Sequence, residues 1–127
     1  GSVDDPTSEA FFETSVGDRV FFAIDESVIN AEARTALDGQ ATWLNGNTEF
    51  TVIIEGHADE QGTREYNLAL GARRANAVRE YLIAAGVSGD RIQTLSYGKE
   101  RPVELCSLER CYAQNRRGVT VLNNVGF

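Results

Sequence analysis

Hydrophobic residues in this chain fall into short alternating runs of the kind that form β-strands. Phe50, Val52 and Ile54 occupy every second position of residues 50–55, so they share one face of an extended segment. The β-branched and aromatic residues of 19–24 indicate another strand. The expected strands are residues 19–24, 50–55, 92–97 and 119–122.

Two longer segments show instead the spacing of amphipathic helices. One follows Asn30, a residue type that caps helix N-termini, and the other spans residues 64–85 and ends before Gly86. Residues 112–117 fit either a further helix or an ordered loop. The expected buried stripes are Ala33, Leu37, Ala41 and Leu44 in the first helix, and Leu68, Gly71, Ala75, Val78 and Leu82 in the second.

The order of these elements predicts the fold class. Strands separated by helices cannot form simple hairpins, so some strands must pair in parallel. We expect an α/β fold, an α+β sandwich in which a mixed four-stranded β-sheet carries helices packed on one face in a βαβαββ-like order. Residues 1–18 are expected to be an N-terminal tail with a short helix, and residues 19–127 to form one domain.

Charge narrows the range of partners. The chain of 127 residues carries 12 Lys and Arg against 19 Asp and Glu, a formal net charge of −7. Such a protein is repelled by phosphate backbones and anionic membrane surfaces, so we expect no nucleic-acid partner. The arginines nevertheless gather at 73–79 and 110–117. They either recognise a discrete anionic group or merely lie on solvated helix faces.

Cysteine spacing argues against a structural zinc site. Cys106 and Cys111 have no second pair of cysteines to complete one. A short-range disulfide formed in an oxidising compartment is one interpretation, and two free buried thiols are the other.

Residues 56–63 (GHADEQGT) are the strongest candidate for a site, because they join the end of a strand to the start of a helix. Free N–H groups at a helix start suit a carboxylate ligand, although such residues also serve simply as helix caps. Arg74 lies about 40° around the helix from Val78, and Arg73 about 140°. We therefore expect Arg73 to face solvent and Arg74 to lie on the rim of the buried face. Asp59 is the natural partner of Arg74. The two residues either belong to a ligand site or form a purely structural ion pair.

Catalysis finds little support in the sequence. His57 is the only histidine, there is no Gly-x-Ser-x-Gly motif, and a metal at this loop would depend on carboxylates with poor geometry. We expect a binding protein with no catalytic residues, no metal and no cofactor.

A longer block of the sequence resembles a known family. Residues 56–78 (GHADEQGTREYNLALGARRANAV) are similar to the signature of the outer-membrane protein A-like domain, closest to its peptidoglycan-associated lipoprotein branch. Further similarity lies in VFFAID at 20–25, SYGKERP at 96–102 and NRR at 115–117. The resemblance covers about residues 19–122.

The resemblance implies non-covalent binding of peptidoglycan through the meso-diaminopimelate of its stem peptide. In the family, a loop aspartate takes the diaminopimelate ammonium and a helix arginine takes its carboxylate, and these match Asp59 and Arg74. The other positions that the resemblance implies for the pocket are Asp25, Asn67, Asn115 and Arg116.

The resemblance also implies a location at the periplasmic face of the bacterial outer membrane. A TolB-like periplasmic protein is the expected partner, and membrane attachment is expected only through an N-terminal lipid anchor that this sequence does not include. Two alternatives are an adaptor whose main partner is TolB and the wall-binding domain of another outer-membrane protein. A metal-dependent hydrolase using His57 and Asp59 is the third.

Overall fold

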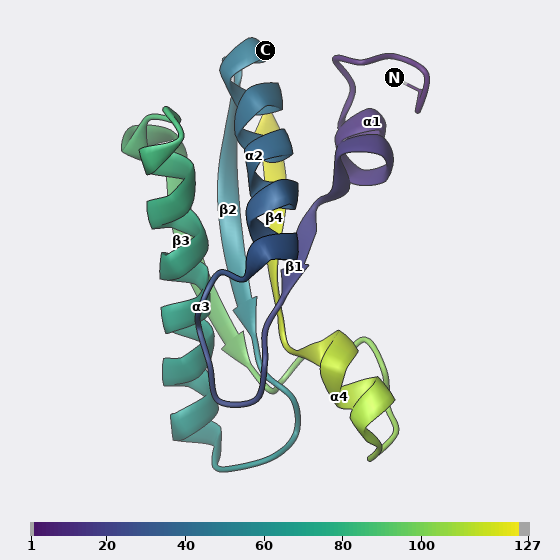
Figure 1. Ribbon diagram of the computed structural model, residues 1–127, viewed down its shortest axis with the longest axis vertical. Coiled ribbons are helices and arrows are strands. Elements are labelled where there is room, and N and C mark those ends of the chain that lie inside the picture. The colour runs from purple at the N-terminus through teal and green to yellow at the C-terminus, as the bar shows by residue number, and fades with distance from the viewer. Residues whose placement is uncertain (1, 125–127) are drawn as a thin grey trace.

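A four-stranded mixed sheet carries two long helices on one of its faces (Figure 1). The computed structural model describes residues 2–124. The elements are α1 (Glu9–Phe11), the π-helical η1 (Phe12–Gly17), β1 (Arg19–Phe21), α2 (Ala31–Gly46), β2 (Phe50–His57), α3 (Arg64–Ala84), the 3₁₀ turn η2 (Gly89–Arg91), β3 (Ile92–Gly98), α4 (Glu109–Asn115) and β4 (Arg117–Asn124).

The strand order β1-β4-β2-β3 brings three loops to one end of the sheet. β4 is antiparallel to both β1 and β2, whereas β3 is parallel to β2. The strands β1, β2 and β3 therefore run in the same direction, and the segments that follow them start at the same end of the sheet (Figure 1). The predicted fold class, a mixed four-stranded sheet with helices on one face, is confirmed.

The core lies between the sheet and helices α2 and α3. Phe50, Val52 and Ile54 are buried on the helix side of β2, as their alternation predicts. All four predicted positions of the α2 stripe are buried as well. In α3 the prediction was wrong at one position: Leu68 is only half-buried, while Leu70 is buried. The segment 22–30 covers the first half of α3. The periodicity of a single helix cannot predict burial by another segment of the chain.

Two glycines set how closely α3 approaches the sheet. A Cβ atom on Gly56 would overlap the backbone carbonyl of Gly71, and a Cβ atom on Gly71 would overlap the Ser96 hydroxyl. The Ser96 hydroxyl also donates to the Leu68 carbonyl, 2.7 Å away. Backbone-to-backbone contact of this kind requires glycine. The first half of α3 is thereby held against the carboxyl end of β2, where the candidate site begins.

The N-terminal segment joins the same core. Phe12 is fully buried and stacks at a tilt on Trp43, with ring centroids 5.0 Å apart. The Trp43 indole donates to the Pro6 carbonyl at 2.7 Å. Aromatic pairs of this kind contribute about 0.5–1.5 kcal/mol beyond their buried area. The η1 turn and Pro6 thus pack on α2, while the division of the chain at residues 18 and 19 stays a prediction.

The open question at residues 112–117 is answered by a helix for residues 112–115, since α4 begins at Glu109 and ends at Asn115, while Arg117 already starts β4. A disulfide joins Cys106 to Cys111, whose Cα atoms lie 5.7 Å apart, and so closes the segment that leads into α4. None of the helices in residues 2–124 has the length and apolar character needed to cross a membrane.

Candidate ligand-binding site

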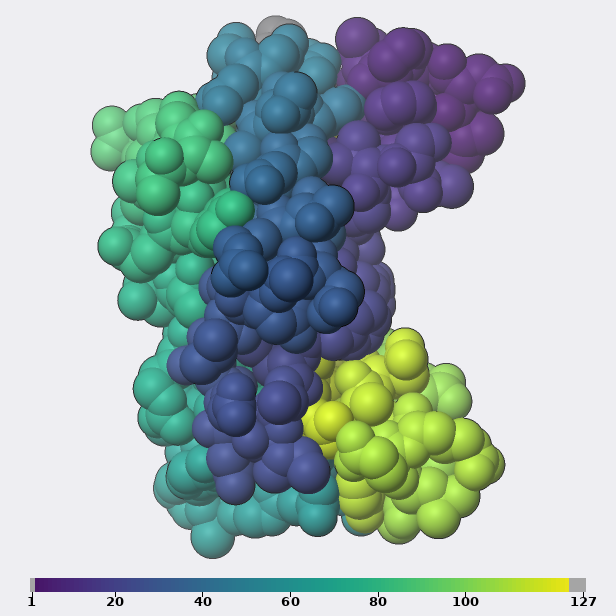
Figure 2. Space-filling view, in the orientation of Figure 1, coloured from purple at the N-terminus to yellow at the C-terminus, as the bar shows by residue number. Residues whose placement is uncertain are grey.

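A pocket of about 240 Å³ opens at the carboxyl ends of the parallel strands. Segment 22–30 and the loop 58–63 meet there beside the first half of α3, and in Figure 2 these segments and the α4 region adjoin at the lower end of the molecule. Such crevices are the usual ligand sites of sheets with parallel strands. The polar lining consists of two carboxylates, two guanidinium groups, two amides and a phenol, from Asp25, Asp59, Arg74, Arg116, Gln61, Asn67 and Tyr66.

Arg74 is a buried cation held by backbone carbonyls. Its side chain has no exposed surface, and its Nε, Nη1 and Nη2 donate to the carbonyls of Glu26 (2.8 Å), His57 (2.9 Å) and Ala23 (3.0 Å). The Phe22 ring covers one face of the guanidinium, 5.3 Å from its centroid. Each terminal nitrogen carries a second N–H in addition to the one used here. The group is therefore fixed in orientation and retains donors.

The charge of Arg74 has no salt-bridge partner in the part of the chain that the structure describes. Burial, reinforced by the nearby Arg116, lowers the pKa of Arg74 to about 10, so the guanidinium remains protonated at neutral pH. Burying an unpaired cation is costly. A cation that lines a pocket in this state is well suited to an anionic ligand.

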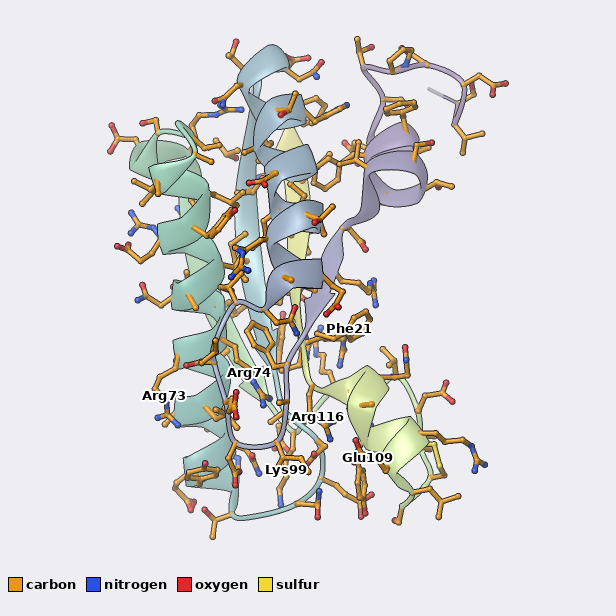
Figure 3. The ribbon with its side chains drawn as sticks, viewed as in Figure 1. Phe21, Arg73, Arg74, Lys99, Glu109 and Arg116 are labelled. Atoms are coloured by element: carbon orange, nitrogen blue, oxygen red, sulfur yellow. A yellow bond between two sulfur atoms is a disulfide. The ribbon has the colours of Figure 1, made fainter. Side chains whose placement is uncertain are left out.

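The structure corrects two expectations about Arg74. It is fully buried rather than on the rim, because segment 22–30 closes over it. It also makes no hydrogen bond or salt bridge with Asp59, which pairs instead with Arg116. Arg73 does point away from the sheet, as predicted, and Figure 3 shows the two side chains directed to opposite sides of α3.

Asp59 is buried at the start of the loop after β2. Its Oδ1 accepts from the Gln61 backbone N–H at 2.9 Å, an Asx turn that holds the carboxylate in place. Its Oδ2 accepts two longer contacts of 3.3 Å, from the Gln61 amide and from Nη1 of Arg116. The carboxylate is therefore oriented but not saturated, since an ionised carboxylate has about four acceptor sites.

Arg116 lies between Asp59 and a second acid, Glu109 of α4. Its Nη1 and Nη2 lie 3.2 and 2.7 Å from the two oxygens of Glu109, and its Nε donates to the Phe22 carbonyl at 2.8 Å. The hydrogen bond with Glu109 raises the pKa of Arg116, and the same bond lowers the pKa of Glu109. The site thus holds two cations, Arg74 and Arg116, and the strong ion pair of Arg116 is with Glu109 rather than with Asp59.

Asp25 borders the pocket from segment 22–30. It is exposed, adopts the left-handed conformation with φ of 60°, and accepts a hydrogen bond of 3.1 Å from the Tyr66 hydroxyl. Aspartate tolerates this conformation better than most residues, and it bends the segment over α3. The acid is therefore at the outer part of the pocket, above the buried guanidinium groups.

The two asparagines expected at the pocket have different environments. Asn67 lines it, and its Nδ2 donates to the carbonyls of Gln61 and Thr63, which ties the loop to α3. Asn115 does not line it. The Asn115 amide instead bonds the backbone of Val103 and Glu104 at 2.8–3.1 Å, so it fixes the residues that lead into the disulfide.

His57 lies on the opposite face of the sheet from the helices. Its ring stacks on Tyr97, its Nε2 is 3.0 Å from Glu55, and burial lowers its pKa. Only its backbone carbonyl reaches the site, through Arg74. A joint role for the His57 and Asp59 side chains, as a metal-dependent hydrolase requires, has no geometric support.

Three comparisons with known proteins show the family and the fold of the chain. Residues 21–116 match the model of the OmpA family. This chain belongs to the OmpA family. It is 54% identical over 121 residues to the peptidoglycan-associated lipoprotein of Mesorhizobium japonicum, covering 95% of the chain and 72% of that protein. It is 52% identical over 97 residues to the protein of the same name from Pseudomonas aeruginosa, covering 76% of the chain and 57% of that protein. These relatives place it in the peptidoglycan-associated lipoprotein branch.

Solved structures give the same result for the fold. The peptidoglycan-associated lipoprotein from Burkholderia pseudomallei superposes with a TM-score of 0.86 at 36% identity, covering 94% of this chain and all of that one. The C-terminal domain of Helicobacter pylori MotB superposes with a TM-score of 0.77 at 20% identity, which shows a shared fold alone. The OmpA family is not a family of enzymes, so the prediction that the chain is not an enzyme is confirmed.

Sequence reasoning missed two side chains at this OmpA-family pocket, Tyr66 in its lining and Glu109 outside it. Tyr66 supplies a hydroxyl to Asp25, and Glu109 holds the Arg116 guanidinium. The position of Tyr66 in the first turn of α3, next to the candidate loop, was a usable signal. Glu109 lies seven residues before Arg116, about two helical turns, so its signal depended on residues 109–115 forming a helix, which the sequence left open.

Proposed function

We propose that this domain binds peptidoglycan non-covalently through the meso-diaminopimelate of the stem peptide. The observation that carries the proposal is the buried guanidinium of Arg74, which lines the pocket without a salt bridge inside residues 2–124. The printed name of the relatives, peptidoglycan-associated lipoprotein, supports the same ligand.

The chemistry of diaminopimelate matches the two kinds of charge in the pocket. One end of this residue carries an ammonium and a carboxylate on a single carbon. Arg74 offers free N–H donors for the carboxylate, while Asp59 offers acceptor capacity for the ammonium. Charge-assisted hydrogen bonds of this kind contribute roughly 1.5–3 kcal/mol each. Asp25, Asn67 and Arg116 also line the pocket, whereas Asn115 acts on it indirectly.

In the cell, we infer that such binding tethers the outer membrane to the wall as part of the Tol–Pal system. The domain would lie at the periplasmic face of the outer membrane, attached through an N-terminal lipid anchor. The relatives' description as lipoproteins supports this location.

A second candidate function is an adaptor for a TolB-like protein. Large apolar side chains are exposed on the two segments beside the pocket. Val28 is 64% exposed in segment 22–30, and Leu105 is 88% exposed immediately before the disulfide-bonded Cys106. Exposed apolar side chains near a functional site favour a protein partner. Such a partner would cover the pocket, so the two functions would compete.

The test of wall binding is sedimentation of the protein with insoluble sacculi whose stem peptides contain meso-diaminopimelate. We expect the wild type to pellet and Asp59→Asn to lose at least about tenfold in affinity, because one charge-assisted bond is removed. Glu65→Gln is the matched control, since it removes an exposed charge from the first turn of α3. Failure of the wild type to pellet would reject the proposal.

A change on the ligand avoids any effect on folding. Sacculi with amidated diaminopimelate carboxylates should bind more weakly, because amidation removes the anion assigned to Arg74. Equal binding to both kinds of sacculi would reject that role for Arg74 while leaving wall binding in place.

A further inference from the structure

Arg116 has two acids competing for one guanidinium. Glu109 contacts both terminal nitrogens, at 2.7 and 3.2 Å, whereas Asp59 has a single contact of 3.3 Å with Nη1. A guanidinium presents one planar fork on this side, and a bidentate pair occupies it. Glu109 holds that fork, so Asp59 is left with the weaker share of the positive charge.

Which carboxylate forms the bidentate pair with Arg116 decides how much of Asp59 is free to bind a ligand. Asp59 lines the pocket, while the side chain of Glu109 is 62% exposed on its outside. If the Arg116 fork turned to Asp59, both oxygens of that carboxylate would be engaged by a protein cation. An incoming ammonium would then have to displace the guanidinium. The arrangement in the structure instead keeps acceptor sites of Asp59 open.

The disulfide keeps Glu109 within reach. An exposed glutamate gains little from an ion pair, because fixing its side chain costs conformational entropy. Here Cys106 and Cys111 bracket Glu109, and Cys111 is itself buried. Within the bracket, the Ser107 hydroxyl also donates to the Glu60 carboxylate, at 3.0 and 3.2 Å from its oxygens. The closed segment is thereby tied to the pocket loop through Ser107 and to Arg116 through Glu109.

We propose that Glu109 is a positioning residue of the pocket, which draws the Arg116 fork away from Asp59 and so leaves Asp59 available for a ligand ammonium group. The Cys106–Cys111 bridge holds Glu109 in the position from which it does this. The inference rests on the proposed function, because it assigns Asp59 to the ammonium of diaminopimelate. Figure 3 shows Arg116 directed toward Glu109 at the base of α4.

The test is calorimetric titration with a soluble stem-peptide fragment that ends in meso-diaminopimelate. Glu109→Gln should weaken binding about fivefold, the scale set by a partly exposed ion pair. Glu104→Gln is the matched control, since it removes an exposed charge two residues before the disulfide, and it should leave affinity unchanged. Glu109→Asp keeps the carboxylate and should recover part of the loss. Cys106→Ser with Cys111→Ser should weaken binding in the same direction.

A spectroscopic measurement separates positioning from general loosening of the fold. The Arg116 Nε–H signal in ¹⁵N NMR reports the guanidinium environment without ligand. It should move in Glu109→Gln and stay in place in Glu104→Gln, with equal thermal stability of the two variants. A signal that does not move in Glu109→Gln would contradict the proposal.

The binding outcomes distinguish the two proposals. If the wild type binds the fragment and Glu109→Gln binds equally well or more tightly, the positioning role is wrong and the proposed function stands. If the wild type fails to bind the fragment, the proposed function is wrong, and the positioning role falls with it.

Discussion

The two ends of the sheet bury different kinds of side chain. At the amino end of β2, the core consists of aromatic and aliphatic groups such as Phe12, Leu44 and Phe50. At the carboxyl end, the buried groups include Asp59, Arg74 and other polar residues. Apolar burial stabilises the fold at roughly 25 cal/mol per Å². Buried charge does not stabilise by itself, and here backbone carbonyls offset only part of the desolvation of Arg74.

This difference separates what holds the domain together from what it binds with. The apolar end needs no ligand to be complete. The polar end holds a pinned cation and an oriented carboxylate, both with hydrogen-bonding capacity left over. Perturbed ionisable groups concentrate at functional sites for this reason.

The largest effect is expected at the apolar end. Leu44→Ala should lower the free energy of unfolding by about 3 kcal/mol, because Leu44 is fully buried and its truncation leaves a cavity. Urea unfolding measures this loss. Sacculus binding, measured where the variant is still folded, should not change. Asp59→Asn should show the reverse pattern, and a binding defect in Leu44→Ala would break the comparison.

A smaller effect on the free energy of unfolding is expected from pH. Burial, the main cause, lowers the pKa of His57 below its usual 6.5 in the folded state. The unfolded chain takes up a proton near pH 6.5 while the folded chain does not, so stability is complete above that pH and declines as pH falls toward the folded-state pKa. Urea unfolding between about pH 7 and pH 5.5 should show this slope. The His57→Gln variant should lack the slope, and an equal slope in both proteins would exclude His57 as its source.

The smallest effect is expected at Arg73. Its side chain is exposed and lies 5.9 Å over the Tyr66 ring, so Arg73→Ala should change stability by less than about 0.5 kcal/mol. Sacculus sedimentation should also be unchanged. Arg74→Ala is the contrasting neighbour, expected to lose wall binding and some stability, because it orphans three carbonyls. Similar behaviour of the two variants would refute the assigned geometry.

Much of the fold was predictable because periodicity is a local property. The alternation at Phe50, Val52 and Ile54 and the stripe from Ala33 to Leu44 each follow from a single element facing the core. The angle between Arg73 and Arg74 is likewise set by one helix. The loop of Asp59 was identifiable because a glycine-bounded polar segment lies between a strand and a helix.

The pairings inside the site were not predictable in this way. The sequence by itself determined the mixed sheet, its helical cover and the group of residues from which the pocket is drawn. Only the tertiary structure decided that segment 22–30 buries Arg74, that Arg116 pairs with Asp59 and Glu109, and that Asn115 turns away from the pocket. The physical reason is that the contacts of Arg74 and the Arg116–Asp59 pair join segments far apart in the chain. The Arg116–Glu109 pair and the Asn115 contacts are closer in sequence, but they form only because α4 is a helix and the chain before it turns back onto Asn115. Their partners are set by the packing of loops after three different strands, and no local pattern of residues encodes that packing.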